Sequence, residues 1–561
     1  MKKINIIFLY LLTVVSCGLD YNETSTYSKE DIFAARVSGI DKMVWGIYAQ
    51  MKCDKGNDFS DGAMLCSASD EAVCSWPNSD IHNFYNGGWS ALNPLSDAWS
   101  YYFTAIRQAN FFLAEASELT FDEYKYNKDY EDYMKKYSRY KYEVRFLRAF
   151  FYFNLVRAYG DVPLITTVLT PEEANKAYRV PSAKIFDFII SECNDVIPHL
   201  STDYNNETGQ ETGRATRQMA YALKARAALY AASPLFNEFD DPRLWERAAK
   251  ENLEAIRKCE EFGAAINNYS DLWGAENYRN SEIILSLRES ESSYFEAYNY
   301  PIGVEGGRAA NCPSQTLVDA YDVKPAEEPE VQETDVPETE EPQTRPSPYD
   351  NLDPRFAMTI ARNDEIWPAY NPVPLQIYAG GDNGLPLAGA SQTGYYLKKY
   401  CDTSVDLRPN NSTDKQHSFI VFRLGELYLN YAEAVFRTLG NAQVTSAQFP
   451  MSANQAVNAV RTRADVNMPP FEGSKDFFNR YVRERMVELA FEEHRFWDVR
   501  RWKKGAECFS KVDVMEVTKA GDTFNYRRKT IDRAWDDKMY FFPIPAKELA
   551  VNKNLTQNIG W

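Results

Sequence analysis

Histidine is scarce in this chain, and the motifs that organise catalysis around it are missing. Only four of the 561 residues are histidine, and no HExxH pattern or other close histidine pair occurs. A histidine-based metal centre is therefore not expected. The sequence also lacks a GxSxG nucleophile elbow and a GxxxxGK[ST] phosphate loop. These absences favour a binding protein over an enzyme, and we expect no catalytic residue.

Long apolar runs and an excess of basic residues are also absent. No run of 18 or more apolar residues occurs, so no transmembrane helix is expected. Acidic residues outnumber basic residues 80 to 62, giving a net charge of −18, and this balance argues against nucleic acid as a partner. The chain is 44% hydrophobic and 14% aromatic, which is too rich for a disordered chain. An acidic, aromatic-rich globular protein is indicated.

Cysteine is sparse, and no CxxC pair with zinc-ligand spacing is present. Of the nine cysteines, Cys17 belongs to the N-terminal segment described next. We expect most of the other eight to be buried free thiols, with the three between 53 and 74 the best placed for a disulfide in an exported protein. We expect no cofactor. The glycine-rich segment 380–384 has the composition of a turn, and a structural calcium ion bound there is the alternative interpretation.

The N-terminus has the pattern of an export signal. Lys2 and Lys3 precede a 12-residue apolar stretch, 4–15, which ends at a small-residue junction before Cys17. The segment resembles a bacterial lipoprotein signal, which implies cleavage of residues 1–16 and acylation of Cys17. Several acyl chains on one cysteine would anchor the protein to a membrane without spanning it. An ordinary signal peptide with a coincidental cysteine is the alternative.

Helical periodicity dominates the rest of the chain. From 138 to 159, apolar residues recur at spacings of three and four, and Gly160 and Pro163 then end the helix. Segment 214–234 is so rich in small residues that a neighbouring helix must lie close to it. Paired amphipathic helices predict a mainly α fold of tetratricopeptide-like hairpins forming one body with minor β structure, although no clean 34-residue period occurs. The other predicted helices are 95–117, 182–198, 243–262, 424–435 and 474–502.

Long loop-rich segments rich in aromatic residues separate the helices. They cover 54–94, 263–313 and 349–417, and loops of this length in a compact protein are usually functional or disordered. Their aromatic content argues for order. Segment 324–348 differs, because it is rich in proline and carries eight acidic residues between 327 and 341. It has the composition of a mobile, solvated insertion.

A set of characteristic phrases runs along the chain and is most concentrated in the C-terminal third. Upstream they include segments 99–110, 145–152, 159–163 and 353–356. The C-terminal phrases are Thr393-Gly394-Tyr395-Tyr396-Leu397-Lys398-Lys399-Tyr400, Phe422-Arg423-Leu424-Gly425-Glu426-Leu427-Tyr428-Leu429-Asn430-Tyr431-Ala432-Glu433-Ala434, Arg483-Glu484-Arg485-Met486-Val487-Glu488-Leu489-Ala490-Phe491-Glu492-Glu493-His494-Arg495-Phe496-Trp497-Asp498 and Phe542-Pro543-Ile544-Pro545. Together they resemble the SusD/RagB family of nutrient-uptake outer-membrane lipoproteins, and the resemblance covers nearly the whole mature chain.

This resemblance implies one SusD-like domain over 17–561, with ligand loops grouped on one face. It implies a lipid-anchored, cell-surface glycan-binding protein of the outer membrane. Its partners would be an oligosaccharide or polysaccharide and a SusC-like TonB-dependent transporter. Independently of the resemblance, the arginine and glutamate residues of 474–502 are expected to form ion pairs that join helices rather than to catalyse a reaction.

A glycan site needs flat aromatic surface with polar groups at its edge. One aromatic contact that covers about 100 Å² at ~25 cal/mol per Å² contributes about 2.5 kcal/mol, less than the ~4 kcal/mol of millimolar binding. Several aromatic residues and an oligosaccharide are therefore required. The opposing interpretation is that each aromatic residue packs its loop onto the helical body. Three loop stretches supply the candidates, which are Trp76, Tyr85, Asn86, Trp89, Tyr294, Tyr298, Arg308, Trp367, Tyr370 and Tyr378.

Two other functions stay open. A surface glycoside hydrolase would use a pair of loop carboxylates, with Asp58 or Asp61 acting together with Asp364 or Glu365. A peptide-binding or scaffolding protein would use the helical hairpins for protein contacts alone.

Overall fold

The computed structural model describes residues 36–59, 61–204, 211–324 and 348–561. The chain divides into two units, Met1–Gly46 and Ile47–Trp561. Helix α2 (Arg36–Tyr48) begins in the first unit. The predicted signal peptide, Cys17 and nearly all of segment 324–348 lie outside the described residues. Within the described ranges, no helix combines the length and apolar character that crossing a bilayer requires.

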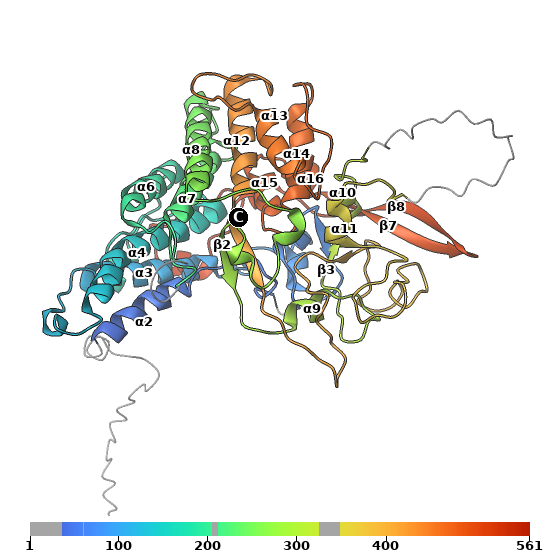
Figure 1. Cartoon of the computed structure of the whole chain (residues 1–561), viewed down its shortest axis with the longest axis horizontal. Helices are drawn as coiled ribbons and strands as arrows, with labels where there is room; N and C mark the ends of the chain where they lie inside the picture. Colours follow the sequence, from blue (N-terminus) through green and yellow to red (C-terminus); the bar gives the residue numbers. More distant parts are fainter. Residues whose placement is uncertain (1–35, 60, 205–210, 325–347) are drawn as a thin grey trace, which may run out of the picture. The chain divides into compact units, whose positions relative to one another are not determined.

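The second unit is built mainly from helices, as the sequence predicted. The protein is 42% helix and 11% strand, and the tetratricopeptide-like description fits it. A series of long helices forms the body, each packed against the next, as Figure 1 shows. In order they are α3 (Ala98–Glu115), α4 (Tyr130–Tyr159), α6 (Ser182–Val196), α7 (Arg217–Ala232), α8 (Pro242–Glu261), α12 (Leu424–Leu439) and α13 (Ala453–Arg461).

Two local sequence features explain how these helices begin, end and pack. Gly160 ends α4 with a φ of 69°, a left-handed conformation that glycine adopts without steric cost. Helix α7 is buried continuously from Met219 to Ala232 and packs against both α6 and α8. Its alanines allow the neighbouring helices to approach closely, as the small-residue composition of 214–234 predicted.

The predicted single helix over 474–502 is wrong, because the chain breaks in its middle. The segment forms α14 (Phe477–Glu488) and α15 (Arg495–Arg501). Between them Phe491 and Glu493 adopt φ values of 59° and 63°, which no α-helix contains. The Phe491 amide donates to Glu71 Oε1 at 2.7 Å. A distant segment therefore supplies a partner for a backbone group that the helix break leaves free.

Buried ion pairs join α14 to the segments around it. Arg355 contacts Glu484 and Glu488 at 2.7 Å each, and Arg423 contacts Glu488 at 2.8 Å and Glu492 at 2.7 Å. All five side chains are at most 2% exposed. The arginine and glutamate residues of this region thus join elements, as the physical interpretation of the sequence expected.

Short helices and strands attach the long loops to this body. The short helices are α5 (Pro171–Ala174), α9 (Tyr294–Asn299), α10 (Gln315–Val318), α11 (Arg355–Thr359), α16 (Gly505–Cys508) and α17 (Ala546–Val551). In the described residues the strands form four antiparallel pairs. These are β1 (Ala72–Cys74) with β3 (Asn311–Pro313), β2 (Ile283–Arg288) with β6 (Ser418–Arg423), β4 (Ile360–Ala361) with β5 (Tyr396–Leu397), and β7 (Lys511–Ala520) with β8 (Thr523–Asp532).

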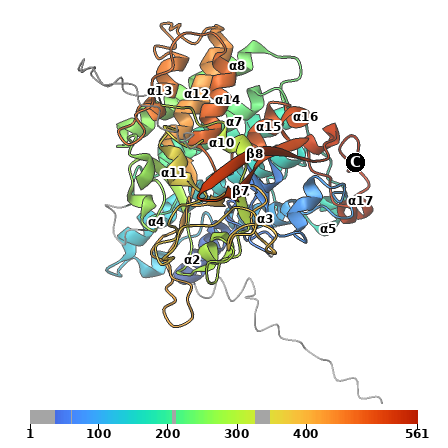
Figure 2. The same cartoon turned by 90° about the vertical axis from the view of Figure 1, so that its right-hand side faces the viewer.

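The strand pairs bring together loops that are far apart in the sequence. Val73 of β1 pairs with Cys312 of β3, which places the first loop-rich segment beside the second. Figures 1 and 2 show the loops between 360 and 417, yellow to orange, beside the β7–β8 hairpin. The first and second loop-rich segments therefore lie side by side in this unit.

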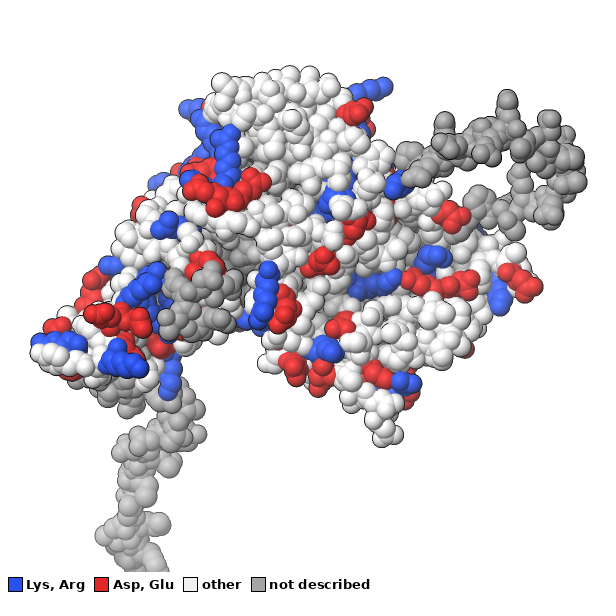
Figure 3. All heavy atoms as spheres, in the orientation of Figure 1, with Lys and Arg blue, Asp and Glu red and all other residues white. Residues whose placement is uncertain are grey.

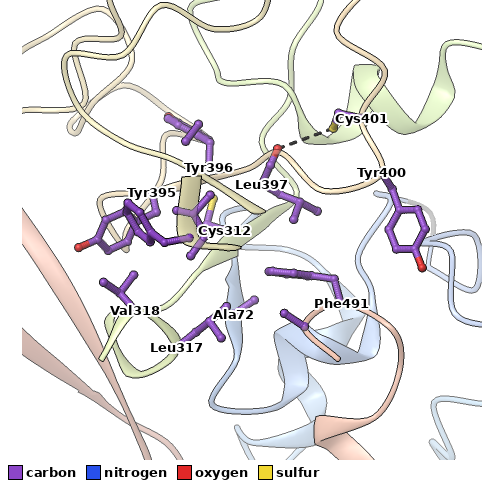
Figure 4. Packing of buried hydrophobic residues seen from close by; sticks show 14 of the residues in the cluster. Ala72, Cys312, Leu317, Val318, Tyr395, Tyr396, Leu397, Tyr400, Cys401 and Phe491 are labelled. Carbon is purple, nitrogen blue, oxygen red and sulfur yellow. Dashed lines mark hydrogen bonds between the residues drawn. The ribbon is translucent and has the colours of Figure 1, made fainter. Parts of the chain in front are cut away.

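A hydrophobic cluster beneath these loops holds them in place. Figure 4 shows Ala72, Cys312 and Tyr396 packed together although they come from three separate strands. Cys401 Sγ lies 3.7 Å from the Leu397 carbonyl oxygen. All eight cysteines of the described residues are free thiols, and six of them are buried. The prediction of buried free thiols is confirmed for this part of the chain, and the set between 53 and 74 forms no disulfide.

Candidate functional site

Segment 301–310 connects the three loop stretches. The Trp76 indole Nε1 donates to the Arg308 carbonyl at 2.7 Å, and the Tyr370 hydroxyl donates to the Glu305 carbonyl at 2.8 Å. Asn383 Nδ2 donates to the Ile302 carbonyl at 2.8 Å. A Cβ on Gly303 would collide with the Asp382 carbonyl, so glycine is required for this close approach. The first and third stretches are thus fixed to opposite ends of one short segment.

Exposed and half-buried aromatic rings lie around this segment. Tyr294 and Tyr298 are four residues apart on α9, and their rings stack with centroids 6.1 Å apart and planes 21° apart. The Arg308 guanidinium lies 5.6 Å from the Tyr298 ring centroid. Tyr294 is 70% exposed, and Trp76 and Tyr298 are half-buried. This surface has the composition a sugar ring requires, aromatic faces with a guanidinium at the edge.

A cavity of about 500 Å³ lies beside Tyr294 and Tyr298; we call it the α9 cavity. This volume falls in the range of small-molecule sites, ~300–1,000 Å³. Lys55 and Glu289 both line it and form an ion pair with each other. Its remaining lining comes from the loop before β1, from α9 and from the start of β6, and includes Asn57, Phe59, Ser292, Phe295, His417 and Phe419.

A buried histidine–carboxylate pair lies at this cavity. His417 Nε2 is 2.8 Å from Glu296 Oε1, and the Asp402 amide donates to the same oxygen at 2.7 Å. Burial alone would lower the pKa of His417, but the hydrogen bond and charge of Glu296, together with Asp402, outweigh burial and raise it. A cationic imidazole beneath the aromatic lining therefore becomes more populated near neutral pH than for a free histidine.

The structure buries two of the predicted ligand-binding tryptophans in the core. Trp89 is 3% exposed, and its ring packs against Phe542 and Trp561 with centroids 5.0 and 4.9 Å away. Trp367 is also 3% exposed and packs edge-on against Tyr300 at 5.1 Å. Neither ring offers a face to a ligand, because other aromatic residues already cover it.

The remaining candidates lie at the edge of the surface or away from it. Tyr85 is linked to Trp76 through His82, whose Nδ1 is 2.5 Å from the Tyr85 hydroxyl and whose Nε2 is 2.7 Å from the Trp76 carbonyl. Asn86 is exposed and uses its side-chain oxygen to accept the Gly88 amide at 2.8 Å. Tyr378 packs on the β7–β8 hairpin, with Phe524 5.6 Å away.

Sequence reasoning missed most of the lining of the α9 cavity. Phe59 lies within the loop-rich segment 54–94, but the next aromatic residue after it is Trp76. The sequence around Phe59 therefore shows no aromatic cluster that would predict a binding site. His417 immediately precedes β6 and Phe419 is its second residue, and neither belongs to a sequence pattern typical of a ligand site. Among the described residues, no group of three or more histidine, cysteine or acidic side chains is arranged to hold a metal ion.

Comparison with known proteins now assigns the family. Residues 278–561, about half of the chain, match the model described as the SusD family, and residues 19–229 match one described as starch-binding associating with outer membrane. The chain belongs to the SusD family. The predicted family and the mainly α fold are thereby confirmed.

Relatives within this family share the fold across nearly the whole chain. The starch-binding protein SusD of Bacteroides thetaiotaomicron is 24% identical over 520 residues, 88% of this chain and 84% of that protein. A solved SusD-like protein of Bacteroides fragilis is 27% identical with a TM-score of 0.73, covering 93% and 97% of the two chains. A SusD-like carbohydrate binding protein of the same species is 25% identical with a TM-score of 0.70, covering 92% and 99%.

Proposed function

We propose that this SusD-family protein binds an oligosaccharide at the cell surface and delivers it to a SusC-like TonB-dependent outer-membrane transporter. The observation that carries the proposal is the surface formed by Trp76, Tyr294, Tyr298 and Arg308 beside the α9 cavity. We call these four residues the aromatic surface. Family membership supports the same conclusion, because relatives are named for starch and carbohydrate binding.

The energetics favour an oligosaccharide over a single sugar. Each aromatic face that covers about 100 Å² contributes about 2.5 kcal/mol at ~25 cal/mol per Å² before binding costs. The aromatic surface offers three such rings, so a chain of several sugar units would be needed to contact all of them. The hydrogen bond from Trp76 to Arg308 holds the indole in place before binding, which lowers the entropy cost of ordering it.

The proposed function is binding without cleavage. Of the carboxylates considered for a hydrolase, Glu365 is held by Lys398 at 2.7 Å and also accepts the Arg362 amide. Asp61 accepts the Ala63 amide at 3.2 Å. These carboxylates have structural partners on the protein, which favours a binding role.

Isothermal titration against a glycan panel tests binding. We expect a ligand whose affinity falls about tenfold, equivalent to 1.4 kcal/mol, in Tyr294→Ala, because the 70% exposed ring of Tyr294 loses its contact with the sugar. Tyr178→Ala is the matched control, since Tyr178 is 69% exposed and belongs to none of the three loop stretches. Equal loss in both variants, or release of shorter sugars on long incubation, would contradict a non-cleaving site at α9.

Attachment to the outer membrane is proposed through the acylated Cys17, after removal of 1–16. We expect Cys17→Ser to move the protein from the membrane fraction to the soluble fraction of the cells, because several acyl chains provide the membrane affinity. Cys508→Ser, which replaces a half-buried thiol, serves as the control and should stay with the membrane. Fractionation followed by immunoblotting measures both. Retention of the Cys17→Ser protein in the membrane would reject the lipid anchor.

A further inference from the structure

A second polar cavity lies on the helical body, beside the end of β2. Its volume is about 250 Å³, and it is lined by residues 202–204 and 212–213, the first turn of α7, the turn after α8, helix η6 (Asn277–Arg279) and strand β2. Asp203 is the acidic residue among the described lining. We call it the Arg288 cavity. Its polar side chains near β2 include Gln218, Tyr278, Arg279, Ser286 and Arg288. None of the three predicted loop stretches had pointed to it as a binding site.

Among the described residues, a tyrosine ring and a backbone carbonyl hold Arg288 in place. Its guanidinium lies 4.5 Å from the centroid of the Tyr278 ring, and its Nη2 donates to the Thr212 carbonyl at 2.7 Å. Within the described residues no carboxylate lies at ion-pair distance from it, whereas Figure 3 shows basic and acidic side chains lying close together over much of the face it draws. In a chain with a net charge of −18, an unneutralised and oriented arginine points to an anionic ligand.

Two further donors line the same cavity. Arg279 has only a long ion pair, 3.7 Å from Glu276, in which both side chains are about two-thirds exposed, and such pairs contribute little. Ser286 is 8% exposed, and its hydroxyl has no hydrogen-bond partner in the described structure. Ser286 and Arg288 are two apart on β2, in regular register with Ile420 and Ser418. Their side chains therefore lie on the same face of the strand.

The position of this cavity relates it to the aromatic surface. Glu289, the residue after Arg288, lines the α9 cavity, whereas Arg288 lines the Arg288 cavity. Consecutive residues of a chain are about 3.8 Å apart, so both cavities lie beside the same end of β2.

We propose that the Arg288 cavity binds the anionic group of an acidic saccharide, a uronate carboxylate or a sulfate ester. Guanidinium groups donate hydrogen bonds and accept none, so two arginines match the acceptor oxygens of an anion better than the mixed hydroxyls of a neutral sugar. The saccharide part of this inference rests on the proposed function. The anion part rests on Arg288, Arg279 and Ser286 alone.

Calorimetric titration of the mature protein with glucuronate at low ionic strength tests the inference. We expect saturable binding that weakens as salt is added, because the contact is ionic and solvent-accessible. Arg288→Gln should lower the affinity at least tenfold, and Arg288→Lys, which keeps the charge but not the two-pronged donor geometry, should lower it less. Arg243→Gln is the matched control, since Arg243 is an exposed arginine on α8 that should leave glucuronate binding unchanged.

Further arms separate the alternatives. Glucose should not bind at this site, and inorganic sulfate should compete weakly; sulfate as tight as glucuronate would overturn the saccharide part. Trp76→Ala should leave glucuronate binding intact, so loss of binding in that variant would assign the anion to the aromatic surface and overturn the proposal. Unchanged binding in Arg288→Gln, or no saturable binding by the wild type, would also overturn it. If glucuronate does not bind as proposed, the proposed function is still tested separately, by the glycan-panel titration of the wild type and Tyr294→Ala.

Discussion

Replacing Glu488 by glutamine is expected to lower the free energy of unfolding by about 3–5 kcal/mol at pH 7. Glu488 contacts Arg355 Nη1 at 2.7 Å, Arg423 Nη1 at 2.8 Å and Arg463 Nη2 at 2.5 Å. All four side chains are at most 2% exposed. Removing one negative charge leaves three buried guanidinium groups with fewer acidic partners, and water cannot replace them. Thermal or urea unfolding of both proteins measures the loss.

The stability lost in Glu488→Gln should depend on pH. Burial opposes ionisation of Glu488, but Arg463, Arg423 and Arg355 outweigh it and lower its pKa to about 2 from an ordinary 4.5. A carboxyl with a lowered pKa in the folded state adds stability above its unfolded pKa and loses it as the pH falls through the folded value. The stability difference between wild type and Glu488→Gln should therefore be full above pH 4.5 and shrink toward pH 2.

An exposed glutamate provides the control for this prediction. Glu246 lies on α8, is 41% exposed and pairs with Lys250 at 2.8 Å, so Glu246→Gln should change the stability little because solvent screens such pairs. A similar loss in both variants would show that the cost is not specific to the buried network. A difference for Glu488→Gln that stays constant between pH 7 and pH 3 would contradict the assigned pKa.

The second large effect concerns the ligand. The double variant Trp76→Ala/Tyr298→Ala is expected to lower glycan affinity at least a hundredfold, because two rings that each contribute up to about 2.5 kcal/mol are removed together. The two residues are linked through Arg308, whose carbonyl accepts from Trp76 and whose guanidinium lies over Tyr298. Isothermal titration with the ligand found in the glycan panel measures the change.

Conservative and matched variants separate lost contact from lost structure. Trp76→Phe keeps a flat ring but loses the hydrogen bond to Arg308. Its glycan affinity should therefore lie between that of the wild type and that of Trp76→Ala. The control pair Tyr126→Ala/Tyr178→Ala removes two exposed rings, 89% and 69% accessible, outside the three loop stretches, and should bind normally. An unchanged melting temperature shows that the Trp76/Tyr298 variant is folded. A folded variant that binds as tightly as the wild type would remove the aromatic surface from the site.

Sequence patterns predicted the helical body well because helix formation is governed by neighbours three and four residues apart. The stop of α4 at Gly160 and the close packing of α7 followed from local composition alone. The break at Phe491 was not predictable in this way. It depends on Glu71, which is 420 residues earlier and accepts the Phe491 amide, and no local pattern contains that partner.

The candidate site also combines features that were predictable from local sequence with features that depend on tertiary contacts. The three aromatic loop stretches were identified from composition, and the structure connects them through segment 301–310. Composition could not distinguish Trp76 from Trp89, which lie in one loop-rich segment. Trp89 is covered by Phe542 and Trp561 from the other end of the chain, whereas Trp76 is only half-buried. The α9 cavity and the Arg288 cavity likewise combine residues from several segments.

The amino-acid order by itself determined most of the long helices, the family phrases and the supply of aromatic rings in the loops, because each depends on residues close together in the chain. Tertiary structure alone decided which rings face outward, which arginines meet a carboxylate and where cavities lie. The physical reason is that exposure and charge pairing are set by whichever distant segment packs against a side chain. In this protein the same residue types therefore form both the core and the proposed ligand surface.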